Sequence, residues 1–81
     1  MLNYTVILKD VPKNILQGLP EVLNQARLPN MQIDASINHD MNYACLDVET
    51  TETIKIFALS QVVDMIDYAG IGDFVSEIGV D

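Results

Sequence analysis

The sequence predicts an α+β domain in which an antiparallel sheet carries two helices on one of its faces. Segments 2–9, 31–38 and 43–49 alternate apolar and polar residues, the period-two pattern of strands with one buried face. Segments 15–27 and 50–68 repeat apolar residues every three or four positions, which is typical of amphipathic helices. Strands and helices mixed in this way indicate a sheet with helices packed on it.

The clearest local prediction is a hairpin. Strands 31–38 and 43–49 are joined by the polar loop 38–42, Asn-His-Asp-Met-Asn, whose residues favour turns. The first strand, 2–9, is expected to end at Asp10–Asn14, which contains a proline.

Pro20 leaves two alternatives for the first helix. Proline lacks an amide hydrogen and restricts the residue before it. Either the helix 15–27 is kinked at Pro20, or a short turn at 13–18 precedes a helix at 20–27 with Pro20 in its first position.

The second helix is expected to begin at a threonine cap, either Thr50 or Thr51, and to end at Gly70, which suits a left-handed C-terminal position. Segment 71–80 has two interpretations. Its alternation favours a strand, with Phe74, Ser76, Ile78 and Val80 on one face, but 73–78 also fits a short helix.

This order of elements, βαββαβ, resembles the ferredoxin-like sandwich, with two helices on one face of a four-stranded antiparallel sheet. That resemblance implies an open second face. The residues expected there are Thr5, Ile7, Lys9, Gln32, Asp34, Ser36, Tyr43, Cys45, Asp47, Glu49, Val75 and Glu77. Many such domains bind RNA on this face through aromatic and basic residues, but here Tyr43 lies among carboxylates. The face is expected either to contact a protein or to be solvated.

Charge narrows the class of partner. Twelve acids against four Lys and Arg give a net charge of −8, which repels nucleic acid and anionic membrane but attracts basic proteins. The alternative is that this excess of acidic residues only makes the protein soluble. With 81 residues, we expect one small acidic domain, 1–81. The N-terminus shows no signal-peptide pattern and no run spans a membrane, so a cytoplasmic location, of a cell or of an infected host, is expected.

Seven residues are the candidate partner-binding set, chosen as acids with one aromatic. They are Asp34, Tyr43, Asp47, Glu49, Asp64, Asp67 and Glu77. Acids that gather toward the C-terminus also suggest mimicry of nucleic acid, a device of small phage-encoded inhibitors.

The second helix is apolar around most of its circumference, and such a helix is usually buried on more than one side. One stripe contains Ile54, Phe57, Ala58, Val62 and Met65. A second, offset stripe contains Ile56, Leu59, Val63 and Ile66. The second stripe is expected to meet either the first helix or a second copy of the protein, in which case it is a dimer interface.

Catalytic and metal-binding patterns are missing from the sequence. Cys45 and His39 are the only residues of their types, and they fall on opposite sides of the predicted hairpin bend. Zinc requires three or four convergent ligands, and only His39 is a good candidate. We therefore expect no enzyme activity, no metal and no cofactor.

A second resemblance rests on Val6–Pro12, an apolar run ending in Asp-Val-Pro before the first helix. It is similar to the ACT type of amino-acid-sensing domain, which has Asp-x-Pro-Gly at this turn and binds ligands at a dimer interface; here Lys13 replaces the glycine. Two functions are thus expected in order of preference: a protein-binding module, such as a phage-type inhibitor of a basic protein, or a small-ligand-sensing dimer.

Overall fold

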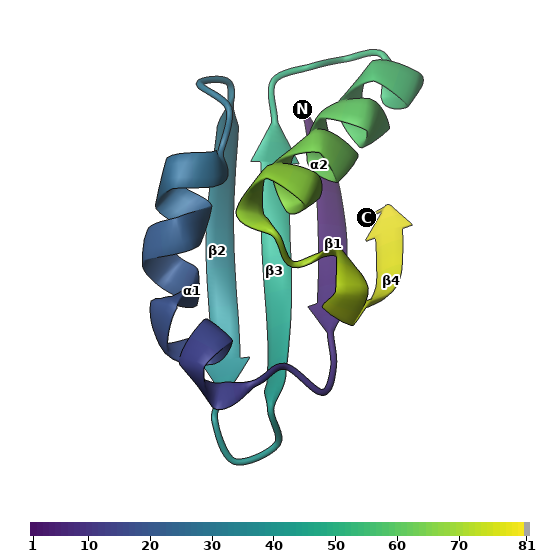
Figure 1. Cartoon of the computed structure of the whole chain (residues 1–81). Helices are drawn as coiled ribbons and strands as arrows, with labels where there is room; N and C mark the ends of the chain where they lie inside the picture. Colours follow the sequence, from purple (N-terminus) through teal and green to yellow (C-terminus); the bar gives the residue numbers. More distant parts are fainter. Residues whose placement is uncertain (81) are drawn as a thin grey trace.

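Four strands form one antiparallel sheet in the order β2-β3-β1-β4, and two helices connect them in the order βαββαβ (Figure 1). The elements of this computed structural model are β1 (Leu2–Leu8), α1 (Lys13–Ala26), β2 (Met31–Asn38), β3 (Tyr43–Thr50), α2 (Lys55–Ala69), a short 3-10 helix η1 (Gly72–Phe74) and β4 (Val75–Val80). The structure describes residues 1–80, so Asp81, the last residue of the expected domain, lies outside the described part. The predicted ferredoxin-like α+β fold is confirmed.

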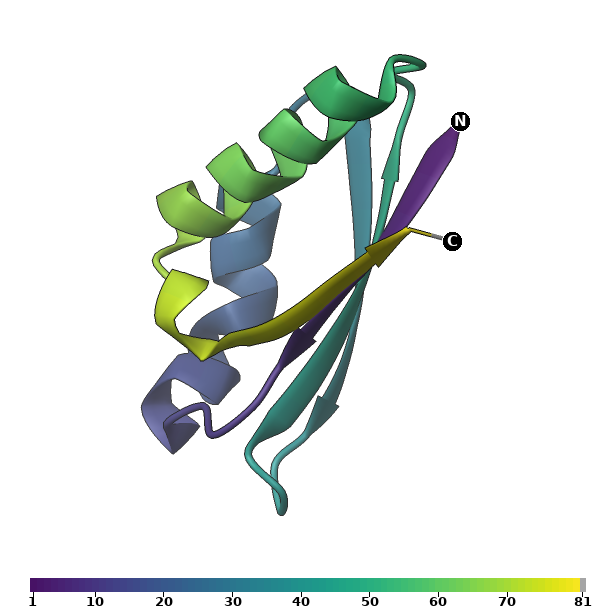
Figure 2. The ribbon, with the colours of Figure 1, turned by 90° about the vertical axis from the view of Figure 1, so that its right-hand side faces the viewer.

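Both helices lie on the same side of the sheet, and the described elements leave its other side uncovered (Figure 2). The core lies between these two layers. Its buried members from the sheet include Tyr4, Val6, Leu8, Leu46 and Val48, and from the helices Leu16, Leu19, Leu23, Val62 and Met65. The hydroxyl of Tyr4 donates to the carbonyl of Lys55 over 3.2 Å, which joins the central strand β1 to the start of α2.

The hairpin between β2 and β3 matches the sequence prediction. The side-chain oxygen of Asn38 accepts the amide hydrogens of Asp40 and Met41 over 3.1 Å each, a turn that asparagine favours. Asn42 closes the loop with a positive φ of 52°, a conformation that asparagine tolerates better than most residues.

Helix α1 is continuous through Pro20, which excludes the alternative of a separate turn at 13–18. A proline inside a helix costs about 3 kcal/mol or more. Leu16, Leu19 and Leu23 are buried on both sides of Pro20, and each buried leucine contributes about 1.5–3 kcal/mol. Burial of the apolar face therefore outweighs the missing hydrogen bond, while Pro20 itself is exposed to solvent.

Helix α2 begins at Lys55, so the predicted threonine cap is wrong. Thr50 belongs to β3, where it pairs with Leu2 and Met31. The Glu52 carboxylate instead accepts the amide hydrogens of Thr53 and Ile54 over 3.1 Å each, just before the helix. The predicted C-terminus is confirmed, because Gly70 has a positive φ of 72° there.

Buried Thr50 joins three segments through its hydroxyl. The hydroxyl donates to the Gln61 side-chain oxygen over 3.3 Å and accepts from the Asn30 amide over 3.4 Å and from the Glu52 amide hydrogen over 3.1 Å. Asn30 also donates to Gln61 over 3.2 Å. These bonds hold the end of β3, the start of β2 and helix α2 together.

Segment 75–80 is a strand, as its alternation favours, but a bulge shifts its phase. Ile7 pairs with Glu77, while Leu8 pairs with Val75, so one extra residue lies in β4 at this point. Val75 consequently packs against the core, and its expected place on the open face is wrong.

Candidate functional site

The open face of the sheet brings three predicted carboxylates onto two neighbouring strands. Asp34 of β2 lies directly opposite Asp47 of β3, and Gln32 lies opposite Glu49. On the other side of β3, Thr5 of β1 lies opposite Asp47. We call Asp34, Asp47 and Glu49 the acidic cluster.

The acidic cluster is electrostatically unfavourable within the protein itself. Side chains directly opposite on antiparallel strands have Cβ atoms about 4.5–5.5 Å apart, and like charges there are destabilising. Asp47 receives a weak hydrogen bond from the Thr5 hydroxyl, with 3.5 Å between the oxygens. Asp34 and Asp47 are both exposed, and solvent screening keeps their repulsion small enough for the sheet to form.

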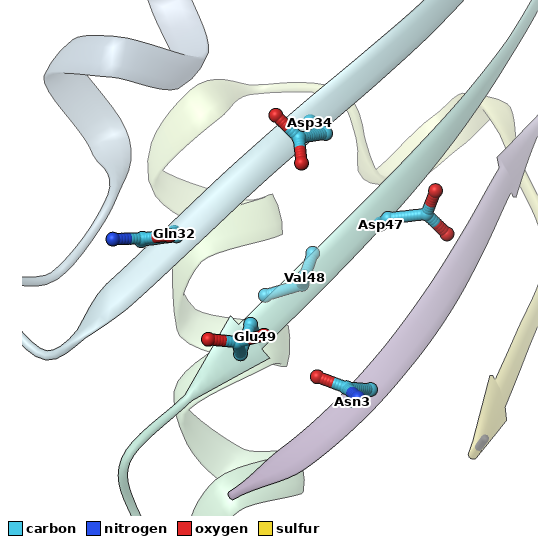
Figure 3. Close-up of a pocket in the computed structure, with 6 residues that line it drawn as sticks. All are labelled: Asn3, Gln32, Asp34, Asp47, Val48 and Glu49. Carbon is cyan, nitrogen blue, oxygen red and sulfur yellow. The ribbon is translucent and has the colours of Figure 1, made fainter.

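A hollow of about 360 Å³ lies over the acidic cluster (Figure 3). Its lining residues are Asn3, Gln32, Asp34, Asp47, Val48 and Glu49. The lining therefore holds three carboxylates and two amides, and none of the four basic residues of the chain. Hydrogen-bond acceptors of negative charge dominate this surface, which suits the side chains of Lys and Arg.

Two further members of the predicted partner-binding set share the open face. Tyr43 begins β3 opposite Asn38 and is half-buried. Glu77 of β4 is exposed and lies opposite Ile7 of β1. The open face thus combines the acidic cluster with an aromatic ring at one end of β3 and a fourth carboxylate on the far strand.

Asp64 and Asp67 lie elsewhere. Both are exposed on α2, which belongs to the helical layer on the other side of the sheet (Figure 2). The structure therefore divides the seven predicted residues between two surfaces, five on the sheet and two on the helix.

The predicted dimer stripe of α2 is mostly exposed. Ile56 is 72% exposed, and Leu59 and Val63 are 41% and 40% exposed. Ile66 is only 4% exposed and packs in the core beside Val62, so its expected place on this stripe is wrong. Ile66 turns inward because the buried side of α2 is centred between the two predicted stripes.

The first predicted stripe of α2, which we call the inner stripe, contains Phe57, but the Phe57 side chain is 55% exposed. Tyr68, at 80% exposed, was in neither stripe. Tyr68 lines a hollow with Asp64 and with Arg27, which directly follows α1. The inner stripe was misjudged because α2 is apolar on almost every side, so periodicity alone does not fix the orientation of the helix.

The two candidate nucleophile and base residues are not brought together. His39 is exposed in the hairpin loop, whereas Cys45 is half-buried within the sheet opposite Ser36. Within residues 1–80, no group of three or more His, Cys, Asp or Glu side chains is arranged to hold a metal ion.

The Asp10–Lys13 turn connects β1 to α1. Asp10 adopts a positive φ of 54°, and Val11 is fully buried with its amide hydrogen bonded to the Asn42 carbonyl over 3.0 Å. Lys13 is the first residue of α1 and is exposed. The tripeptide of the ACT resemblance therefore has a structural role in anchoring this turn to the hairpin.

Neither helix of the described chain is long and apolar enough to cross a membrane. The chain matches no protein-family model, no curated protein and no solved structure. Its functional assignment therefore rests on the surfaces that the fold creates.

Proposed function

We propose that this protein is a non-catalytic binding module whose open sheet face engages a basic protein. The observation that carries the proposal is the acidic cluster: Asp34, Asp47 and Glu49 occupy adjacent positions on two strands and surround one hollow. A basic partner would place Lys or Arg side chains between these carboxylates. Binding would then remove the repulsion that the free protein carries.

The spacing of the cluster favours a partner that handles nucleic acid. Asp47 and Glu49 are two residues apart on one strand, which separates them by roughly 6.6–6.8 Å along the sheet. Asp34 adds one carboxylate on the neighbouring strand, about 4.8 Å away. Three negative charges at these spacings resemble a short stretch of phosphate backbone, so a cleft that binds phosphates would also accept this face. In that case the protein acts as an inhibitor by competing for the cleft.

Affinity capture with matched charge variants tests this proposal. One bait carries Asp34→Asn, Asp47→Asn and Glu49→Gln. The control bait carries Asp10→Asn, Asp40→Asn and Asp73→Asn, which removes the same charge from exposed positions outside the open face. We expect the unaltered protein and the control to retain the same basic protein from native lysate, and the cluster variant to lose it. Rising salt should release the captured protein.

Retention by both variants contradicts the proposal, because binding then does not require the acidic cluster. Loss from both variants contradicts it equally, because net charge and not the cluster would then govern binding. The captured protein is then purified and titrated by calorimetry, with a competing oligonucleotide present, to establish whether it uses its nucleic-acid site.

A small-ligand role is the second candidate, in line with the ACT resemblance. An apolar hollow of about 240 Å³ lies between α1 and the end of α2, close to the Asp10–Lys13 turn. Its lining residues are Asn14, Ile15, Gly18, Leu19, Val22, Ala69, Gly70 and Ile71. Thermal unfolding in the presence of each amino acid tests this candidate, since a ligand that binds the folded state raises the melting temperature.

A further inference from the structure

The outer side of α2 carries a regular ridge of four exposed residues, Lys55, Leu59, Val63 and Asp67. Residues four apart on a helix lie on successive turns, each rotated by about 40° from the last, so these side chains form a ridge that is inclined to the axis of α2. From the N-terminal to the C-terminal end of α2, the ridge consists of one cation, two apolar residues and one anion. We call it the α2 ridge.

The charges of the α2 ridge oppose the helix dipole. The first turn of a helix favours anions and the last turn favours cations. Here Lys55 begins the helix and Asp67 lies in its last turn, and α2 has no acid in its first turn and no base in its last. A monomer therefore gains no helix-dipole stabilisation from this order of charges, whereas an antiparallel partner helix would place opposite charges at both ends.

We propose that two copies of this protein pair through their α2 ridges in antiparallel orientation, about a two-fold axis that passes between Leu59 and Val63. Lys55 then meets the partner's Asp67, and Leu59 meets the partner's Val63. The ridge is complementary to itself in this orientation, as a two-fold interface requires. Each Lys55 also supplies the cation that the C-terminal end of the other helix lacks.

The surroundings of the ridge leave room for a second helix. Asp64 and Tyr68, on another flank of α2, line a hollow with Gln25 and Ala26 of α1 and with Arg27, which follows α1, so that flank faces the end of α1. On the β4 side of α2, within residues 1–80, only the short 3-10 helix Gly72–Phe74 lies near the C-terminal end of α2 (Figure 1). Ile56, at 72% exposed, adds apolar surface beside the ridge.

This dimer is independent of the proposed function, because α2 and the acidic cluster lie on opposite sides of the sheet (Figure 2). The carboxylates of one acidic cluster therefore stay away from the interface. A dimer joined at α2 would present two open faces pointing outward. One helix pair buries less area than a standard interface of about 1,200–2,000 Å², so we expect dissociation on dilution.

Charge reversal at the two ends of the ridge tests the proposal. Sedimentation equilibrium of the unaltered protein, from micromolar to millimolar concentration, should show a mass that rises from 9.0 kDa toward twice that value. Lys55→Asp alone and Asp67→Lys alone each place like charges across the interface, so each variant should stay monomeric over that range. An equimolar mixture of the two single variants should dimerise, and so should the double variant, because both restore opposite charges.

Unfolding does not confound this test. Both residues are exposed, and each single substitution supplies the charge that its end of the helix favours. Circular dichroism should therefore show a folded protein with an unchanged or slightly raised melting temperature. Asp64→Lys is the matched control: it changes the net charge as Asp67→Lys does, but on the flank beside α1, and should leave the dimer intact.

Three results would overturn the proposal: a 9.0 kDa mass at every concentration of the unaltered protein, a dimer that persists in both single variants, or a mixture that fails to associate. None of these results bears on the acidic cluster, whose variants leave the α2 ridge unaltered. Failure of the dimer and failure of the binding module are thus distinguished.

Discussion

Alternate residues of β3 lie in two different environments. Ala44, Leu46 and Val48 face the helices and are at most 1% exposed, whereas Asp47 is exposed and Glu49 half-buried on the open face. The covered face supplies the stability of the domain through apolar burial. The open face tolerates facing carboxylates because water screens them. One side of β3 thus stabilises the domain, and the opposite side belongs to the face that we propose binds a partner.

The largest expected effect comes from the covered face. Leu46→Ala should lower the free energy of unfolding by about 2–5 kcal/mol, because it removes buried methyl groups and leaves a cavity. Asp47→Ala, the next residue along the strand, should change it by less than about 0.5 kcal/mol, as is usual for surface positions. Urea denaturation measures both. Similar losses for the two variants would show that the open face is covered in solution.

A smaller effect is expected where β3 ends. Thr50→Val preserves shape but removes the hydroxyl that serves Gln61, Asn30 and Glu52, so it should cost about 1–3 kcal/mol. Thr51→Val is the control, because Thr51 is the next residue in the sequence and its side chain is exposed. If the two variants unfold at the same urea concentration, the hydroxyl does not join the two layers as described.

The smallest effect should be a gain in stability. Asp34→Asn removes a charge directly opposite Asp47, so the free energy of unfolding should rise by roughly 0.2–1 kcal/mol. The gain should shrink as sodium chloride is added to the urea solutions. Asp40→Asn, in the exposed hairpin loop, supplies the comparison for a general loss of charge. A destabilised Asp34→Asn variant would mean that this carboxylate has a favourable partner within the fold.

Local sequence patterns were sufficient to predict most of the helices and strands. Alternation located β1, β2 and β3, and the polar loop between them specified the hairpin, because both signals depend on neighbours in sequence. The same patterns placed Asp34, Asp47 and Glu49 on one face. Their assembly into a single hollow depended on strand register, which the hairpin loop fixes for β2 and β3.

Other features depended on contacts between distant segments. Pro20 is accepted within α1 because leucines on both sides of it reach the core. Thr50 remains in β3 because Gln61 and Asn30 bind its hydroxyl, although its type and position suggested a helix cap. The bulge in β4 moved Val75 inward against the core, and alternation alone does not reveal an extra residue.

The sequence by itself determined the order of the first five elements, βαββα, the acidic character of the open face and the apolar excess of α2, since composition and periodicity carry all three. It left segment 71–80 open between a strand and a short helix. Only the tertiary structure decided which sides of α2 face outward. Helix α2 is apolar nearly all round, so its rotation is set by how Ala58, Val62, Met65 and Ile66 fit against the sheet and α1. That fit buries Ile66 and leaves Lys55, Leu59, Val63 and Asp67 aligned on the surface.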